Sequence, residues 1–153
     1  MGNTYSQITV QVVFAVKDRE NMLRQEFRPE LFKVINGIIT GKGQIALAVN
    51  GWKDHVHALF GLSPAVCVSD MARDIKANSS KWINEHGLVK GKFQWQDGFG
   101  AFSYSRSQQD TVIKYIINQE KHHAQKTFKE EYLEMLRKSE IEYDERYLFE
   151  FYD

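Results

Sequence analysis

Residues 44–62 read QIALAVNGWKDHVHALFGL, two apolar runs on either side of a glycine-containing turn. Such a pattern is typical of a β-hairpin, so we expect antiparallel strands over 44–50 and 55–62. The second strand contains His55-Val56-His57. Because alternate side chains of a strand point to the same face, both imidazoles should project side by side, with Val56 turned to the opposite layer.

The segments on both sides of this hairpin predict the rest of the sheet. The imperfectly alternating, β-branched run over 4–16 (TYSQITVQVVFAV) favours a first strand that is partly buried on both faces. Apolar residues at helical spacing predict a helix over 29–41. A second helix is expected from Ser69, as its N-cap, to about residue 86. The glycines and aromatics of 93–105 suggest a bent or bulged fourth strand.

Two further helices are expected at the C-terminal end, one over about 108–126 and an acidic one over 127–138. The resulting order, β-α-β-β-α-β-α-α, predicts an α+β fold: a ferredoxin-like split β-α-β antiparallel sheet with C-terminal helices added. We expect one domain over 1–153, with a core over 1–126 and an acidic helical tail over 127–153.

Composition and charge restrict the classes of protein that fit this chain. Of 153 residues, 42% are hydrophobic, and the single Cys67 excludes a disulfide framework and fits a reducing cytoplasm. No charged segment precedes the first apolar run, and no apolar stretch approaches the roughly 18 residues of a membrane span. We therefore expect a soluble cytoplasmic protein with no membrane partner.

The net charge of zero is unevenly distributed along the chain. Residues 1–68 carry +2, residues 69–126 carry +3 and residues 127–153 carry −5. A mildly basic body can bind a polyanion, and an acidic tail can fold against it or weaken nonspecific contacts. The alternative interpretation of the acidic segment is a solvated helix.

His55 and His57 are candidate ligands for one divalent ion. Two neutral imidazoles can chelate a cation and leave most of its charge free to act on a phosphate oxygen. Histidine pairs of this spacing also occur by chance, and a metal site needs a third ligand. The pair alone does not make a structural zinc site.

Tyr115 and Gln119 are four residues apart in the helix expected over 108–126, which places them one above the other. A tyrosine hydroxyl can attack a phosphodiester when a metal polarises the phosphate. The phosphotyrosine product conserves the energy of the broken linkage, so strands could be rejoined without a nucleotide cofactor. Alternatively, Tyr115 only buries its ring on an amphipathic helix.

Together these motifs resemble the single-tyrosine HUH transposases of the smallest bacterial insertion sequences, which are of the IS200-like type. His55-Val56-His57 resembles the histidine–hydrophobe–histidine motif, and Tyr115-x-x-x-Gln119 resembles the tyrosine helix of that family. The stretch FQWQDGFGAFSYSRSQ is similar to the strand that precedes this helix, and YIINQEKHHAQKTFKEEY to the family's tail. The resemblance covers roughly residues 4–147.

The resemblance implies a role for each motif residue. His55, His57 and Gln119 would bind Mg²⁺ or Mn²⁺, with His122 as the alternative third ligand. Tyr115 would cleave single-stranded DNA, leaving a 5′-phosphotyrosine bond and a free 3′-hydroxyl. Members of the family form homodimers in which the tyrosine helix of one subunit can complete the histidine pair of the other. They recognise imperfect DNA hairpins near the ends of the element that they move.

Basic and aromatic side chains after the hairpin are candidates for DNA binding. The basic candidates, which could touch phosphates, are Arg73, Lys76, Lys81, Lys90 and Lys92. The aromatic candidates, which could stack on unpaired bases, are Trp95, Phe99, Phe102 and Tyr104. The alternative roles are general solubility for the lysines and arginine, and core or dimer packing for the aromatics.

Three other functions remain possible from the sequence. A domesticated nuclease of the same kind would cut repeats without moving itself. A ferredoxin-like module could bind single-stranded nucleic acid on its sheet with no need for a divalent ion. A small zinc hydrolase is disfavoured because the sequence shows no evident carboxylate beside the histidine pair to act as its base.

Overall fold

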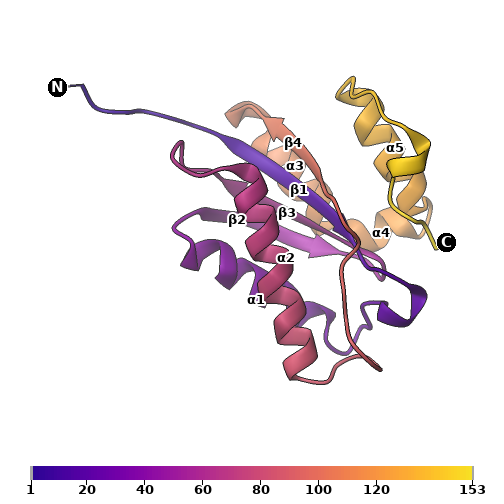
Figure 1. Ribbon diagram of the computed structural model, residues 1–153. Helices are drawn as coiled ribbons and strands as arrows, with labels where there is room; N and C mark the ends of the chain where they lie inside the picture. Colours follow the sequence, from indigo (N-terminus) through magenta and orange to yellow (C-terminus); the bar gives the residue numbers. More distant parts are fainter. Residues whose placement is uncertain (1, 153) are drawn as a thin grey trace.

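A four-stranded antiparallel sheet forms the centre of the computed structural model, which describes residues 2–152 (Figure 1). Its strands lie in the order β2-β3-β1-β4. They are β1 (Thr9–Ala15), β2 (Ile45–Gly51), β3 (His55–Gly61) and β4 (Gly100–Tyr104). This is the arrangement of a split β-α-β unit. The predicted α+β, ferredoxin-like fold is therefore confirmed.

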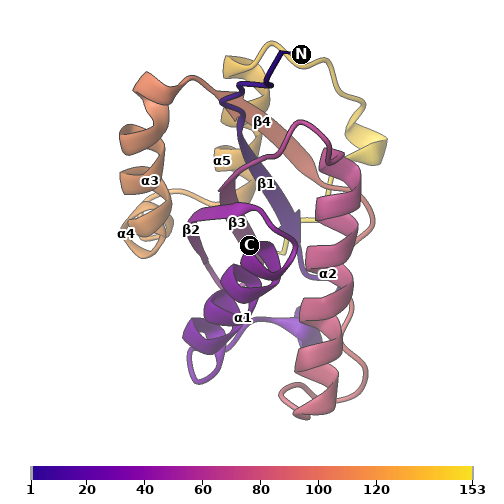
Figure 2. The ribbon, with the colours of Figure 1, turned by 90° about the vertical axis from the view of Figure 1, so that its left-hand side faces the viewer.

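Helices cover both faces of the sheet (Figure 2). One face carries α1 (Arg28–Gly41) and α2 (Val68–Glu85). The other carries α3 (Gln109–Ile117), α4 (Gln119–His123) and α5 (Phe128–Lys138). Short 3₁₀ turns occur at Arg19–Asn21, Arg106–Gln108 and Glu145–Tyr147. No helix in residues 2–152 is long and apolar enough to cross a membrane.

Strand β1 is buried along its whole length because helices pack on both of its faces. Val12 and Phe14 point into the core under α1 and α2, whereas Val13 and Ala15 point into a second core under α5. This two-sided burial confirms the prediction for the strand. It begins at Thr9, however, and not at residue 4.

Helix α2 begins two residues earlier than expected. Cys67 occupies the N-cap, and Ser69 lies within the first turn, where its hydroxyl contacts the Cys67 thiol at 2.9 Å. The buried face of the helix includes Ser79, whose hydroxyl accepts a 3.0 Å hydrogen bond from the indole nitrogen of Trp95. A polar residue is tolerated in this core because its partner is also there.

The single helix predicted over 108–126 is interrupted at Asn118, which separates α3 from α4. The side-chain amide of Asn50, on β2, donates to the carbonyls of Ile116 and Ile117 at 3.0 and 2.9 Å. These bonds satisfy the carbonyls that a helix end leaves without partners. The interruption is thus a tertiary effect, since it depends on a residue more than 60 positions away.

Helix α5 is anchored to the sheet and is not a solvated appendage. The Thr127 hydroxyl caps its start by accepting from the backbone nitrogen of Glu130 at 3.1 Å. Phe128, Tyr132 and Leu136 are buried in the second core with Val13, Ala15, Phe102 and Phe149. The acidic segment therefore folds against the sheet. This agrees with the expectation that the acidic tail packs on the basic body, and not with the alternative of a solvated helix.

Candidate metal and nucleophile site

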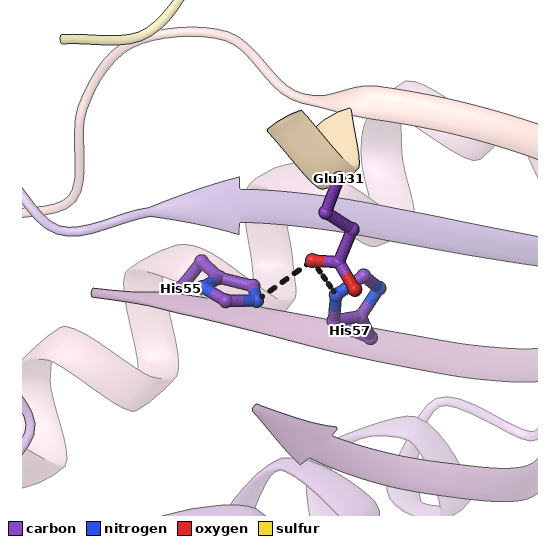
Figure 3. A group of neighbouring side chains, drawn as sticks. All are labelled: His55, His57 and Glu131. Atoms are coloured by element: carbon purple, nitrogen blue, oxygen red, sulfur yellow. Dashed lines mark hydrogen bonds and ion pairs between the residues drawn. The ribbon is translucent and has the colours of Figure 1, made fainter. Parts of the chain in front are cut away.

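Strand β3 presents His55 and His57 to the face of the sheet that α3, α4 and α5 cover, while Val56 enters the core under α1 and α2. Both imidazoles are fully buried. Figure 3 shows the two rings beside each other on one strand, with Glu131 reaching toward them from α5. The expected projection of the pair to one face is confirmed.

A hydrogen bond at Nδ1 orients each of these rings. His55 Nδ1 donates to Oδ1 of Asp54 at 2.7 Å, and His57 Nδ1 donates to Oε1 of Gln11 at 2.6 Å. The ring of His55 also stacks on Phe128, with centroids 3.9 Å apart. Each acceptor holds the Nδ1 proton of its ring and so fixes the orientation of that ring. The other ring nitrogen, Nε2, then points toward Glu131. This is how metal-binding histidines are usually positioned.

The carboxylate of Glu131 lies between the imidazole pair and the candidate nucleophile. Its Oε1 is 3.2 Å from His55 Nε2 and 3.1 Å from His57 Nε2 (Figure 3). Its Oε2 accepts hydrogen bonds from the Tyr115 hydroxyl and, at 3.0 Å, from Nε2 of Gln119. The ligand atoms of His55, His57 and Glu131 all lie within 4.8 Å of one another, so this cluster could hold a metal ion.

Gln119 joins this cluster although the helix is interrupted just before it. The side chain is fully buried, and its Oε1 lies 3.0 Å from His55 Nε2. The same oxygen is 3.1 Å from Nε2 of His123, which also contacts Oε1 of Glu131 at 3.2 Å. The two imidazole nitrogens, one carboxylate oxygen and one amide oxygen are a donor set that a divalent cation accepts.

His122, the alternative third ligand, lies elsewhere. Its ring stacks on that of Tyr115, with centroids 4.3 Å apart, and it is not part of the group of converging ligand atoms. Its buried Nε2 has no hydrogen-bond partner within residues 2–152. The geometry therefore associates His122 with the tyrosine ring and Gln119 with the histidine pair.

Burial and close contacts shift the pKa values of this cluster. Burial lowers the pKa of His55, but the carboxylates of Asp54 and Glu131 outweigh it and raise that pKa to about 9. Burial dominates at His57 and lowers its pKa. Burial and the neighbouring Glu131 raise the pKa of Tyr115. At Glu131 the effect of burial is outweighed by the surrounding histidines, which lower its pKa.

At neutral pH these shifts leave a charged carboxylate facing a protonated phenol. A divalent cation bound here would supply the positive charge that the His55 proton supplies in the free protein, so cation and proton would compete for the site. The donors present thus fit a divalent cation in both chemistry and charge.

The basic residues predicted to bind DNA do not surround this cluster. Arg73, Lys76 and Lys81 lie on α2, which covers the opposite face of the sheet from the histidine pair (Figure 2). Arg73 pairs with acidic neighbours on the same helix, and Lys81 lies 3.8 Å from Glu85. Lys90 and Lys92 are exposed in the segment after α2.

Lys76 differs from the other predicted DNA contacts because its ammonium group binds the protein itself. It donates to the carbonyls of Gln96 and Gly98, each at 2.8 Å, and so holds the segment that leads into β4. Among the candidate stacking residues, Trp95 and Phe102 are buried, as the core alternative expected, whereas Phe99 and Tyr104 are partly buried.

Sequence reasoning missed three residues that make polar contacts with the histidine pair: Gln11, Asp54 and Glu131. The expectation that no carboxylate lies beside the histidine pair was wrong, because Asp54 and Glu131 both contact His55. One signal for Glu131 was available. It follows Phe128 by three residues and precedes Met135 by four, which places a charge on the apolar face of an amphipathic helix. Gln11 and Asp54 carried no comparable signal.

Comparison with known proteins shows the family to which this chain is similar. The chain matches the family model described as "Transposase IS200 like" over residues 4–119. A candidate transposase from Deinococcus radiodurans R1 has a TM-score of 0.61 at 23% identity, covering 78% of this chain and 96% of the other. A REP-associated tyrosine transposase, whose structure was solved bound to a REP hairpin, has a TM-score of 0.56 at 19% identity. The match covers 80% of this chain and 73% of the other. No curated protein matches the sequence. At these identities the structural likeness shows the shared fold.

Proposed function

Because the chain belongs to the IS200-like transposase family, we propose that it is a metal-dependent enzyme that cleaves and rejoins single-stranded DNA through Tyr115. One observation carries the proposal. The hydroxyl of Tyr115 and the Nε2 atoms of His55 and His57 all converge on the carboxylate of Glu131. A nucleophile and a candidate metal site are thus close enough to act on one phosphate.

The proposed ligands of the cation are His55 Nε2, His57 Nε2, Gln119 Oε1 and an oxygen of Glu131. Mg²⁺ or Mn²⁺ bound to them would act as a Lewis acid that polarises a non-bridging oxygen of the scissile phosphate. Gln11 and Asp54 support this role through hydrogen bonds to Nδ1 of the two imidazoles, which keep both Nε2 atoms directed at the proposed cation site.

In the proposed cleavage step, the Tyr115 oxygen attacks phosphorus and the bond from phosphorus to the 3′ oxygen breaks. The phenol loses its proton, and the departing 3′ oxygen gains one from solvent. The raised pKa of Tyr115 means that this proton needs an acceptor, and Oε2 of Glu131 already accepts it in a hydrogen bond. Attack by a 3′-hydroxyl on the phosphotyrosine reverses the step. Since one ester bond replaces another, no nucleotide cofactor is required.

The proposed substrate is single-stranded DNA with hairpin ends, and the proposed assembly is a homodimer acting in the cytoplasm. Tyr115 lies beside His57 of its own chain, with ring centroids 6.3 Å apart, which supports a site formed in cis within each subunit. The exposed side chains of Arg73, Lys81, Lys90 and Lys92 remain the proposed phosphate contacts. Lys76 is included with them, although its ammonium group already has two carbonyl partners.

A covalent-adduct assay tests the proposal. The protein is incubated with Mn²⁺ and a pool of single-stranded DNAs that contain a hairpin with randomised flanks, and the products are run on a denaturing gel. We expect a protein–DNA adduct that Tyr115→Phe abolishes. Tyr147→Phe is the matched control, because Tyr147 is 81% exposed and distant in sequence from the site.

Two results would contradict the proposal. An adduct that persists in Tyr115→Phe would show that another residue is the nucleophile. Hairpin binding without any adduct, unaffected by EDTA, would instead identify a non-catalytic nucleic-acid-binding module.

A further inference from the structure

A cavity of about 220 Å³ lies between α3 and α5 and reaches the candidate nucleophile. Gln11 of β1 and Tyr104 of β4 line it from the sheet. The helices and the segment before α5 supply the rest of its lining, which includes Thr111, Tyr115, Lys126, Glu131, Glu134 and Lys138. We call it the α3–α5 pocket. It shares Gln11, Tyr115 and Glu131 with the candidate site, and its other lining residues have no part in the proposed cation site.

We propose that the α3–α5 pocket binds the nucleoside that carries the scissile phosphate on its 5′ carbon. This inference rests on the proposed function, because it assumes that Tyr115 is the nucleophile. After cleavage the phosphate is bonded to the Tyr115 oxygen, so the attached nucleoside is the next group beyond it. Tyr115 and its contact Glu131 both line the pocket, which therefore lies where that nucleoside must go.

The size of the pocket suits a single nucleoside. Ligand sites for larger molecules usually measure about 300–1,000 Å³, so a cavity of about 220 Å³ admits one base and its sugar but not a base pair. Access to Tyr115 through this pocket would thus require an unpaired strand.

The sheet side of the pocket offers an aromatic ring and polar groups that are fixed in place. Tyr104 is partly buried, and its hydroxyl accepts a 2.7 Å hydrogen bond from Nε2 of Gln11. Oε1 of the same Gln11 accepts from His57. One amide therefore links a candidate stacking ring to His57. Stacking on an aromatic ring tolerates every base, because each base has a π-face.

The rim of the pocket on the α5 side carries two cations that share one carboxylate. Nζ of Lys126 and Nζ of Lys138 lie 2.6 and 3.0 Å from the oxygens of Glu134. One positive charge at this rim is therefore left without a matching carboxylate. Such a charge suits the next phosphate of a strand whose first phosphate is at Tyr115.

Binding of deoxynucleoside 5′-monophosphates to the full chain tests the pocket. We propose titrating dAMP, dCMP, dGMP and dTMP in the presence of Mg²⁺, which is diamagnetic, with NMR chemical shifts as the readout. The comparison compound is 2-deoxyribose 5-phosphate, which has the phosphate and sugar but no base. We expect each nucleotide to bind at least about fivefold more tightly than this compound, because base stacking adds to the phosphate contacts.

Two variants and a control locate the binding. Thr111→Phe puts a ring into the pocket from α3, and Lys138→Ala removes one rim cation; each should weaken dTMP binding by about fivefold. Lys129→Ala is the control, since Lys129 is exposed on the same helix and does not line the pocket. Mn²⁺ affinity should be equal in all three variants and the unmodified protein. If Thr111→Phe fails to fold, the dTMP affinity of Lys138→Ala alone tests whether the pocket binds the nucleotide.

The outcomes separate this inference from the proposed function. Equal affinity for dTMP and 2-deoxyribose 5-phosphate, or dTMP binding that the pocket variants leave unchanged, overturns the pocket as a nucleoside site. The proposed function still stands in that case if the Tyr115-dependent adduct forms. A pocket-dependent affinity for nucleotides without any adduct would keep the pocket as a nucleotide site, but would reject Tyr115 as the nucleophile and with it the link to the scissile phosphate.

Discussion

Glu131 on α5 and His57 on β3 are 74 residues apart in the sequence, yet Oε1 of Glu131 lies 3.1 Å from Nε2 of His57. The position of this carboxylate is fixed by packing, because Phe128 and Tyr132 on the same helix are buried in the second core. Moving this turn of α5 away from the sheet would require exposing those rings to water, at a cost of about 1.5–3 kcal/mol for each ring that is fully exposed. The helix therefore keeps Glu131 beside the histidine pair.

Replacement of Glu131 by glutamine should weaken metal binding. The substitution keeps the shape of the side chain and removes its charge, so we expect Mn²⁺ affinity to fall by about tenfold or more. Glu130→Gln is the control, because Glu130 is the exposed neighbour on the same helix. Isothermal titration with Mn²⁺ measures both. Equal affinities in the two variants would show that Glu131 is not a ligand.

The metal-free protein should lose stability as the pH rises from 6.5 to 9. The pKa of His55 is about 9 in the folded state against 6.5 as its ordinary value, so the folded state binds this proton more tightly. Its contribution is complete below pH 6.5 and is lost as the pH passes 9, which amounts to about 3 kcal/mol. Urea unfolding in EDTA at several pH values measures this loss.

Asp54→Asn is the control for that pH dependence. The variant lacks the carboxylate that helps to raise the pKa of His55. Its loss of stability between pH 6.5 and 9 should therefore be smaller. A stability that is flat over this range in the unmodified protein would contradict the pKa assignment.

Gly100→Ala should disturb the site from a distance. A Cβ at this position on β4 would lie 2.5 Å from the hydroxyl oxygen and 2.8 Å from Cε1 of Tyr132, on the helix that carries Glu131. We expect a loss of about 1–3 kcal/mol in the free energy of unfolding, together with weaker Mn²⁺ binding. Gly41→Ala, at the end of α1, meets nothing within 4 Å and should be neutral or slightly stabilising. Thermal unfolding and Mn²⁺ titration of both variants measure these effects. Equal stability and equal Mn²⁺ affinity in the two variants would contradict the prediction.

Two lysines of α2 should respond differently to removal. Lys76→Ala loses the ammonium group that binds the carbonyls of Gln96 and Gly98, so stability should fall by about 1–2 kcal/mol. Lys81→Ala removes an exposed side chain and should change stability by less than about 0.5 kcal/mol. Chemical unfolding of both variants measures the difference. A larger loss of stability in Lys81→Ala than in Lys76→Ala would contradict the structural role given to the Lys76 ammonium group.

Local patterns were sufficient to predict most of the fold. The hairpin, the two-sided first strand and the helices α1, α2 and α5 follow from hydrophobic periodicity, because each element buries the face that its sequence makes apolar. The interruption at Asn118 was missed because it depends on Asn50, which is remote in sequence. No local pattern reports such a contact.

The candidate site was predictable only where its residues are close in sequence. His55 and His57 share a strand, and Tyr115 and Gln119 are four residues apart, so their spacing carried information. Glu131 joins them through tertiary packing, and its charge made it look like part of a solvated acidic helix. Predicting its place required noticing a carboxylate among apolar neighbours on one helix face.

The match to the family model ends at Gln119, whereas the contacts around the histidine pair continue to Glu131. A chimera that took only residues 4–119 from this protein would inherit the phenol and both imidazoles without the acid that joins them. Any chimera between relatives should therefore treat α5 as part of the candidate site and transplant it together with the sheet.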